Sequence, residues 1–326
     1  MSRKVRVFFN RIRENYLLSN FLAAAARPVW LFCRAMTNQI QMKVKKNGLR
    51  LHVGNGKDLI IGRNAGIGFA SSLFWHGLGG YEAQTSETLR FCFARSSTFI
   101  DVGANCGLYS IIAALWNPRI RVIAFEPFPP IFENLKKNVS LNHIEDRVVC
   151  ENLALSSSSG TGTFHVPDSE GKDYESTGTL AENSWQVRQR ARKVPVKTVR
   201  FDDYEKAHSM KVDLVKIDVE DFEADVLQGM SKTIARDRPF IVCEILQRNK
   251  EHRNERTRQV VEGLKYTPYW ISSSGYIRVS RFDFERRGSQ DFILSPVSTN
   301  HEIITDLAVL FEERERMLSE VISQSK

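Results

Sequence analysis

The stretch FIDVGANCG, residues 99–107, decides the fold of this 326-residue chain. A buried strand, Thr98–Val102, enters a turn that contains two glycines, and an apolar helix, Leu108–Trp116, follows the turn. Glycine allows a sharp turn and lets the backbone approach a ligand, and the N-terminus of a helix offers unpaired N–H groups to negative groups. The stretch therefore predicts a strand–turn–helix unit with a ligand site at its turn.

Strand and helix patterns alternate along the chain after this unit. The expected strands are Arg121–Phe125, Arg147–Leu155, Val212–Ile217 and Phe240–Ile245, and the expected helices are Pro130–Leu141, Phe222–Ile234 and 253–264. Such alternation is typical of an α/β fold with a mostly parallel, doubly wound sheet. Tyr269–Ser273 and Phe292–Leu294 supply a final pair, so we expect a seven-stranded sheet whose last strand is antiparallel.

Composition divides the chain into four segments. We expect a basic amphipathic helical arm over 1–42, a β-meander and an aromatic loop over 43–81, the main domain over 82–300, and a C-terminal helix over 301–326. Hydrophobic residues make up 42% of the chain and charged residues 26%, which excludes a disordered chain and a multi-span membrane protein.

The net charge of +8 is concentrated at the N-terminus. Residues 1–50 contain eleven Lys or Arg and one acid, whereas the remaining 276 residues contain 35 basic and 37 acidic side chains. A nearly neutral body argues against nucleic acid as a partner. The five cysteines form no CxxC pair, which favours a reducing compartment and argues against a zinc site. We therefore expect a cytoplasmic protein.

The arm has the pattern of a basic amphipathic helix. Its apolar residues fall on one side of a helix, with the basic residues outside that side: Val5, Phe8, Phe9, Ile12 and Tyr16. This pattern is typical of a helix on an anionic membrane surface, which would make the protein peripheral on the inner face of the cytoplasmic membrane. Two alternatives stay open. The helix packs on its own domain or on a partner subunit, as in a homo-oligomer, or it is a secretory signal.

A second acid indicates the kind of ligand. Glu126 stands at the tip of the strand Arg121–Phe125, 19 residues after Gly107, where an acid accepts hydrogen bonds from ribose hydroxyls in dinucleotide folds. Asp101, two residues before Gly103, suits the ammonium of a methionine moiety, and the turn lacks the G-x-G-x-x-G pattern that holds a pyrophosphate. S-adenosylmethionine therefore fits better than NAD, which remains the alternative.

Three motifs, in this order and spacing, complete the pattern: FIDVGANCGLYS, AFEPFPPIFENLKKNVSLN and DLVKIDVEDFEADVLQGM. In them the chain resembles the FkbM family of S-adenosylmethionine-dependent methyltransferases over roughly residues 82–295. The resemblance implies a Rossmann-like class I methyltransferase fold and O-methylation of a hydroxyl on a sugar, a glycan (lipid-linked or free) or a natural-product scaffold. Family members typically read K-I-D-V-E-G-x-E, and here Asp221 replaces the glycine that follows Glu220.

The resemblance also implies a set of cofactor-binding residues around the turn, the tip of the second strand and the end of the third. They are Asp101, Gly103, Ala104, Asn105, Gly107, Glu126, Pro127, Leu155 and Ser156. Leu155 and Ser156 stand where family members often have an acidic residue.

Methyl transfer to an oxygen requires that the acceptor hydroxyl be aligned and deprotonated. Asp218 and Glu220 are the candidate catalytic bases, because they follow the fourth strand at the crevice where doubly wound sheets bind ligands. Glu223 lies within one helical turn and Lys216 offsets part of the charge, so one acid is expected to have a raised pKa. Alternatively, these acids stabilise a helix N-terminus or hold the cofactor. Glu244, which ends the fifth strand, is the second-choice base.

Further substrate contacts are expected from aromatic residues outside the motifs. Trp75, His76 and Tyr81 precede the main domain and are placed to form a lid, and Trp185 lies in a polar excursion over 167–193. The histidines show no metal-ligand spacing, so no metal is expected. A nucleic-acid methyltransferase and a non-enzymatic, membrane-associated adaptor that keeps the fold are the alternative functions.

Overall fold

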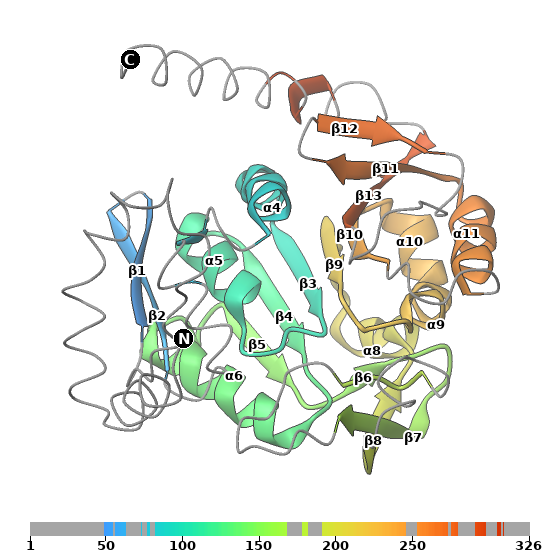
Figure 1. The fold of residues 1–326 in the computed structure, drawn as a ribbon, viewed down its shortest axis with the longest axis horizontal. Coiled ribbons are helices and arrows are strands. Elements are labelled where there is room, and N and C mark those ends of the chain that lie inside the picture. The colour runs from blue at the N-terminus through green and yellow to red at the C-terminus, as the bar shows by residue number, and fades with distance from the viewer. Residues whose placement is uncertain are drawn as a thin grey trace, which may run out of the picture.

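The computed structural model describes residues 49–54, 56–62, 73, 77–78, 82–167, 178–181, 191–245, 253–272, 275–279, 291–297, 305–307 and 309 (Figure 1). The predicted arm and the candidate substrate residues Trp75, His76, Tyr81 and Trp185 lie outside these residues. None of the helices described in these ranges is long and apolar enough to cross a membrane.

The centre of the molecule is a mixed sheet. Its strands are β3 (Thr98–Val102), β4 (Arg121–Phe125), β5 (Val148–Glu151), β9 (Leu214–Ile217), β10 (Phe240–Glu244), β11 (Tyr266–Ser272), β12 (Gly275–Arg278) and β13 (Asp291–Pro296), in the order β12-β11-β13-β10-β9-β3-β4-β5. The strands from β5 to β10 in this order are parallel, and β13 is antiparallel to β10. This confirms the mostly parallel sheet with an antiparallel last strand. The short, half-exposed β12 pairs with β11 and adds an eighth strand to the predicted seven.

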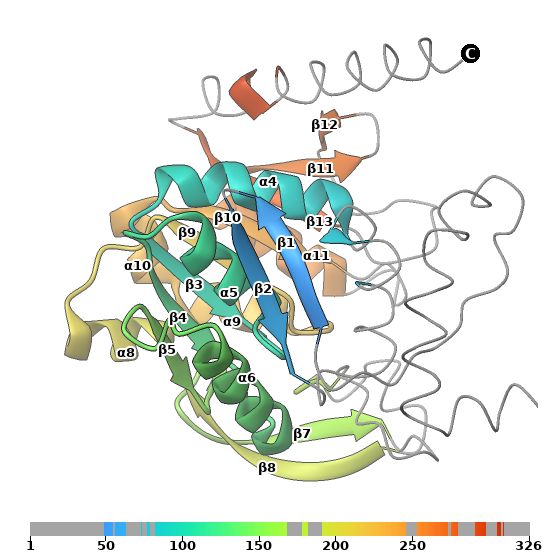
Figure 2. The same cartoon turned by 90° about the vertical axis from the view of Figure 1, so that its left-hand side faces the viewer.

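The sheet has an apolar core on each face because its strands alternate. Phe99 belongs to one core and its neighbour Ile100 to the other, as the two-residue period of a strand requires. Helices cover both faces, which gives three layers (Figures 1 and 2). One layer is α4 (Ala83–Arg95), α5 (Leu108–Trp116) and α6 (Pro129–Leu141), and the other is α8 (Phe201–His208), α9 (Glu223–Gly229), α10 (Ser231–Asp237) and α11 (Arg253–Gly263).

The helix predicted over Phe222–Ile234 is two helices, α9 and α10, which meet at Met230. At Gly229 a Cβ atom would lie 2.0 Å from the carbonyl oxygen of Ser156, so the backbone of a neighbouring segment packs directly on the end of α9. Asp202 satisfies free N–H groups in the first turn of α10. Its carboxylate accepts hydrogen bonds from the N–H groups of Lys232 (3.0 Å) and Thr233 (2.9 Å). A contact from a distant segment therefore decides where α9 ends.

The described part of the predicted meander is a two-stranded hairpin, β1 (Leu49–Gly54) and β2 (Lys57–Ile61). This hairpin packs on α5 and α6 (Figure 2). Asn138 of α6 and Asn142, the residue that follows α6, hold it. Asn138 accepts a hydrogen bond from the Gly62 N–H (2.8 Å), and Asn142 bonds both the N–H and the carbonyl of Ile60. At the other end of the chain, Leu307 is 2% exposed in the same core.

A second, three-stranded sheet lies beside the main one. The strand predicted over Arg147–Leu155 is divided: β5 stays in the main sheet, and β6 (Ala154–Leu155) pairs with β8 (Ala191–Val199), which pairs in turn with β7 (Gly160–Pro167). Phe164 of β7 stacks on Phe128, which precedes α6, at a centroid distance of 6.1 Å. The β7–β8 pair thus reaches over the carboxyl end of the main sheet, where the predicted site residues lie.

Candidate functional site

The predicted site forms where the strand order of the sheet reverses. From β3 the chain runs outward to β4 and β5, then returns to add β9 on the other side of β3. Ligands of open α/β sheets bind at the carboxyl ends of the strands at such a switch point. Val102 pairs with Ile217 across it, so the residues that follow, Gly103 and Asp218, are brought together.

Gly103 is required by this close approach. Its φ is +75°, and a Cβ atom there would lie 1.9 Å from the carbonyl oxygen of Asp218. The N–H of Asp218 donates to the carbonyl of Val102 at 3.0 Å, which keeps the two strand ends in register. The turn continues through Asn105, at φ +53°, to Gly107, the residue before α5. The glycine-bearing turn therefore lies against the loop that carries the predicted catalytic acids.

Glu126 connects the turn to the end of β4. It is 6% exposed, and its two carboxylate oxygens accept hydrogen bonds from the N–H groups of Asn105 (3.0 Å) and Phe128 (2.9 Å). Burial raises the pKa of Glu126 to about 7, although both N–H donors favour its charged form. The carboxylate is thus held at a fixed position beside the turn.

A cavity of about 210 Å³ opens at this place. Five of the predicted cofactor residues line it: Gly103, Asn105, Glu126, Pro127 and Leu155. Four do not: Asp101, Ala104, Gly107 and Ser156. The apolar wall beyond Leu155 comes from α6 and from the second sheet, with Phe164 and Leu180 among its residues. The cavity therefore runs from the turn toward the second sheet.

Asp101 occupies a different place from the one expected. It is 1% exposed and accepts a hydrogen bond from the hydroxyl of Ser110 on α5 at 2.6 Å. Burial raises the pKa of Asp101, and the positive charge of Lys216 opposes that rise. Asp101 is not among the residues that line the cavity, so its predicted role toward the ammonium group stays a prediction.

Glu82 does line the cavity, and sequence reasoning did not single it out. It lines the cavity at the start of α4, with φ +44°, and accepts a hydrogen bond from the hydroxyl of Tyr109 at 2.7 Å. An acid at the first position of the predicted main domain, 82–300, was the available signal. Asp291 was also missed. It pairs with Glu244 across β13 and β10, and burial raises its pKa to about 7.

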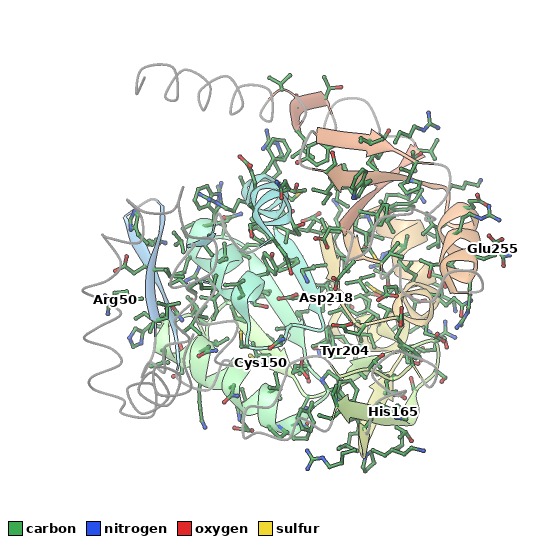
Figure 3. The ribbon with its side chains drawn as sticks, in the orientation of Figure 1. Arg50, Cys150, His165, Tyr204, Asp218 and Glu255 are labelled. Carbon is green, nitrogen blue, oxygen red and sulfur yellow. The ribbon has the colours of Figure 1, made fainter. Side chains whose placement is uncertain are left out.

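The acidic end of the cavity is lined by Asp218, Glu220 and Glu244, whose carboxylate oxygens lie within 4.8 Å of one another. Lys216 does not line the cavity. It is 3% exposed, and its Nζ donates to Asp218 Oδ2 at 2.9 Å and lies 5.0 Å from the ring centroid of Tyr109. Figure 3 shows Asp218 near the centre of the molecule, at the ends of the strands.

The pKa values of Asp218 and Glu244 are shifted in opposite directions. Burial opposes the charge of Asp218, but Lys216 and a hydrogen bond from Glu244 hold the pKa of Asp218 below its ordinary value. Burial and the charge of Asp218 raise the pKa of Glu244 well above its ordinary value. Lys216 is therefore the counter-ion of Asp218, and Glu244 is the carboxyl of this pair that holds a proton more tightly.

Glu223 and a metal are the remaining expectations about this cluster. Glu223 is 4% exposed, does not line the cavity and accepts a hydrogen bond from the N–H of Asp221 at 3.0 Å. The cluster of Asp218, Glu220 and Glu244 is the described group whose oxygens could hold a divalent cation. The ammonium of Lys216 already supplies a positive charge beside it. The expectation of no metal stays a prediction.

Several known proteins resemble part of the chain. The chain is 30% identical over 146 residues to the hexuronic acid methyltransferase AglP of Haloferax volcanii, which covers 44% of the chain and 54% of AglP. It is 28% identical over 155 residues to the 2-O-methyltransferase NoeI of Sinorhizobium fredii, covering 44% and 61%. The methyltransferase sdnD of Sordaria araneosa is 29% identical over 164 residues, covering 41% and 60%. The chain thus spans little more than half the length of these relatives.

Among solved structures, a methyltransferase FkbM from Methylobacillus flagellatus aligns with 72% of this chain and 56% of its own, with a TM-score of 0.41 and 12% identity. The family model of the methyltransferase FkbM domain matches residues 101–276, which is more than half of the chain and contains the turn, Glu126 and the acidic cluster. The chain therefore belongs to the FkbM methyltransferase domain family.

Proposed function

We propose that the protein is an S-adenosylmethionine-dependent O-methyltransferase that acts on a hydroxyl of a sugar, a glycan or a natural-product scaffold. The observation that carries the proposal is the family match over 101–276, because residues at both ends of the cavity, Glu126 and Asp218 among them, lie inside it. Two relatives are named a 2-O-methyltransferase and a hexuronic acid methyltransferase, and these names support an oxygen acceptor on a sugar.

The residues present fit the cofactor. The close approach at Gly103 leaves the turn without side-chain bulk, and the fixed carboxylate of Glu126 has lone pairs left for ribose hydroxyls. Pro127 and Leu155 supply apolar walls for an adenine, and Glu82 would meet the ammonium group in place of Asp101. When bound, S-adenosylmethionine supplies a methyl group on a sulfonium, which is already activated toward an oxygen nucleophile.

The chain's own contribution to the reaction is made at the acidic end. Asp218 is charged and lines the cavity, so its carboxylate can accept the proton of a hydroxyl placed beside it. Lys216 fixes this carboxylate by a charge-assisted hydrogen bond of 2.9 Å. Glu220 lines the same wall and is the second candidate base, whereas Glu244, whose pKa is raised, donates a hydrogen bond to Asp218.

The charge of the wall favours one class of acceptor. Five acids line the described part of the cavity: Glu82, Glu126, Asp218, Glu220 and Glu244. None of the described lining residues is Lys, Arg or His, and Lys216 is engaged with Asp218 behind the wall. An acceptor that carries a carboxylate would meet like charges in a partly buried site. We therefore expect a neutral or amine-bearing sugar to be a better acceptor than a uronic acid.

The location that we propose is the inner face of the cytoplasmic membrane, reached through the arm. Support comes from the sequence alone, since eleven basic residues lie among residues 1–50 beside an apolar helix face. A membrane-bound enzyme would meet lipid-linked glycans. Co-sedimentation with anionic vesicles should fall as salt rises and should be lost when residues 1–42 are removed. Equal binding by the truncated protein would point to packing or oligomer formation by the arm.

The decisive experiment measures cofactor and acceptor separately. Calorimetry should show binding of S-adenosylmethionine and none of NAD. Isotope-labelled S-adenosylmethionine is then incubated with cell-envelope glycans, with nucleic acid and with a panel of octyl glucoside, glucosaminide and glucuronide, and mass spectrometry locates the label. Label on a sugar hydroxyl supports the proposal, and label on nucleic acid replaces it. Cofactor binding without transfer to any of these acceptors would favour the adaptor.

A further inference from the structure

We propose that Thr179 is a positioning residue that holds Glu220 at the cavity. This proposal rests on the proposed function, because it takes Glu220 to act at the acceptor end. Thr179 belongs to residues 178–181, which we term the strap. These are the described residues of the segment between β7 and β8. These residues lie in the polar excursion predicted over 167–193. The contacts of Thr179 give it a definite place in the site.

Thr179 is 0% exposed and is bound on its backbone by β7. Its N–H donates to the carbonyl of His165 at 3.1 Å, and its carbonyl accepts from the His165 N–H at 2.7 Å. This antiparallel bridge continues the second sheet by one residue. Figure 3 shows His165 in the second sheet. The backbone position of Thr179 is therefore fixed independently of its side chain.

The side chain of Thr179 points to the loop that carries the predicted catalytic acids. Its hydroxyl lies 2.6 Å from the carbonyl oxygen of Glu220 and 3.2 Å from that of Val219, and it accepts a hydrogen bond from the N–H of Ala181 at 3.0 Å. A hydroxyl has one proton, so the shorter contact identifies the carbonyl of Glu220 as its main acceptor. One buried side chain thus ties the strap to the peptide that follows Glu220.

That peptide is under conformational strain. Glu220 and Asp221 have φ values of +54° and +77°, in the left-handed region that costs a residue with a Cβ atom about 1–2 kcal/mol. Two hydrogen bonds from outside the turn hold it: the Thr179 hydroxyl binds the Glu220 carbonyl, and Glu223 accepts from the N–H of Asp221. Loss of the first would let the peptide rotate toward an unstrained conformation, and the direction of the Glu220 side chain would rotate with it.

The strap also forms part of the cavity that Glu220 lines. Gly178 and Leu180, on either side of Thr179, are lining residues. A movement of the strap therefore displaces the apolar wall and the Glu220 carboxylate together. This coupling predicts that Thr179 affects turnover through Glu220, while the turn at Gly103 and its carboxylate partner Glu126 keep their geometry.

The test compares Thr179→Val, which keeps the shape and removes the hydroxyl, with Thr179→Ser, which keeps the hydroxyl. Thr88→Val is the matched control, because Thr88 is also 0% exposed and its hydroxyl also donates to a backbone carbonyl, that of Gln84 on α4. Hydrogen exchange of residues 219–223, the affinity for S-adenosylhomocysteine and turnover on the best acceptor of the glycoside panel are measured for each variant.

In Thr179→Val we expect hydrogen exchange of residues 219–223 to become about tenfold faster and kcat to fall about tenfold, which is the size of one lost buried hydrogen bond. The affinity for S-adenosylhomocysteine should stay the same. Thr179→Ser should restore both. In a Glu220→Gln background, Thr179→Val should lower kcat no further, because two residues that act through one group are not additive.

Three results overturn the proposal: unchanged exchange in Thr179→Val, the same change in Thr88→Val, or a full additional loss of kcat in the Glu220→Gln background. If the wild-type protein methylates no acceptor, the proposed function fails, and the exchange difference between the Val and Ser variants still decides whether Thr179 holds the loop.

Discussion

The backbone of Gly103 packs so closely on Asp218 that a Cβ atom at Gly103 would lie 1.9 Å from the carbonyl oxygen of Asp218. The two residues are 115 positions apart in the chain and follow two paired parallel strands, β3 and β9. This contact joins the glycine-bearing turn to the acidic cluster, so the two halves of the proposed site share one geometry.

Gly103→Ala should be strongly destabilising. The new methyl group would overlap the Asp218 carbonyl, and the φ of +75° is unfavourable for alanine, so we expect a loss of more than about 2 kcal/mol in the free energy of unfolding. Urea unfolding measures it. Gly56→Ala is the control, because Gly56 has a φ of +69° with nothing within 4 Å of its Cβ position. Equal losses in both variants would mean that the contact with Asp218 contributes nothing.

Glu126→Ala should weaken binding of S-adenosylmethionine by about 1–3 kcal/mol, the cost of losing hydrogen bonds to a charged acceptor. The N–H groups of Asn105 and Phe128 would also lose their acceptor, which loosens the turn. Isothermal titration calorimetry gives the affinity. Glu133→Ala, at an exposed position of α6, is the control and should bind normally. Unchanged affinity in Glu126→Ala would place the ribose elsewhere.

Asp218→Asn should lower turnover by about 10²–10⁴-fold, the usual contribution of a general base. The amide keeps the shape of the side chain but cannot take the proton. Lys216 still has the negative charges of Glu82 and Asp101 near it, so its ammonium is not left without an opposite charge. S-adenosylhomocysteine binding and the melting temperature are measured with turnover, so that a folding defect is recognised. Glu220→Gln is the paired variant. Near-normal turnover in both variants would make the cluster structural and direct the search for the base to Glu244 or His76.

The protein without cofactor should become less stable as pH rises from about 5 to 8. Burial raises the pKa of Glu126 to about 7, of Glu223 to about 8 and of Asp291 to about 7. These carboxyls bind protons more tightly in the folded chain than in the unfolded chain, so between the two pKa values stability falls by about 1.4 kcal/mol per pH unit for each group.

Urea unfolding at several pH values measures this slope. Glu126→Gln and Glu223→Gln should each make it shallower, whereas Glu133→Gln, at an exposed position, should leave it unchanged. A slope that none of the buried variants alters would contradict the assignment.

Asp221→Gly should stabilise the protein by about 1 kcal/mol. Asp221 has a φ of +77°, which glycine adopts without strain, and its negative charge contributes to the raised pKa of Glu223. Asp221→Ala separates the two effects, because it removes the charge and keeps the strain. Thermal unfolding should therefore rank the glycine variant above the alanine variant. A wild-type protein more stable than the glycine variant would show that the side chain of Asp221 makes a favourable contact larger than the strain.

Short-range patterns of apolar residues, glycines and strand-end acids were enough to predict the alternating strands and helices, the mostly parallel sheet and the turn at Gly103. The sequence also predicted that Glu126 and Asp218 stand at strand ends, and the parallel register of the sheet places both at one cavity. Such features need only the local chain and the rule that parallel strands end at the same edge.

The tertiary structure alone decided which acids reach the cavity. Asp101 and Glu82 are both acids near the first strand, yet a hydroxyl of α5 holds Asp101 under the wall while the start of α4 brings Glu82 into it. The break between α9 and α10 and the contact of Thr179 with Glu220 also join segments far apart in the chain. Burial and hydrogen-bond partners at that range depend on packing, and no local pattern of residues encodes them.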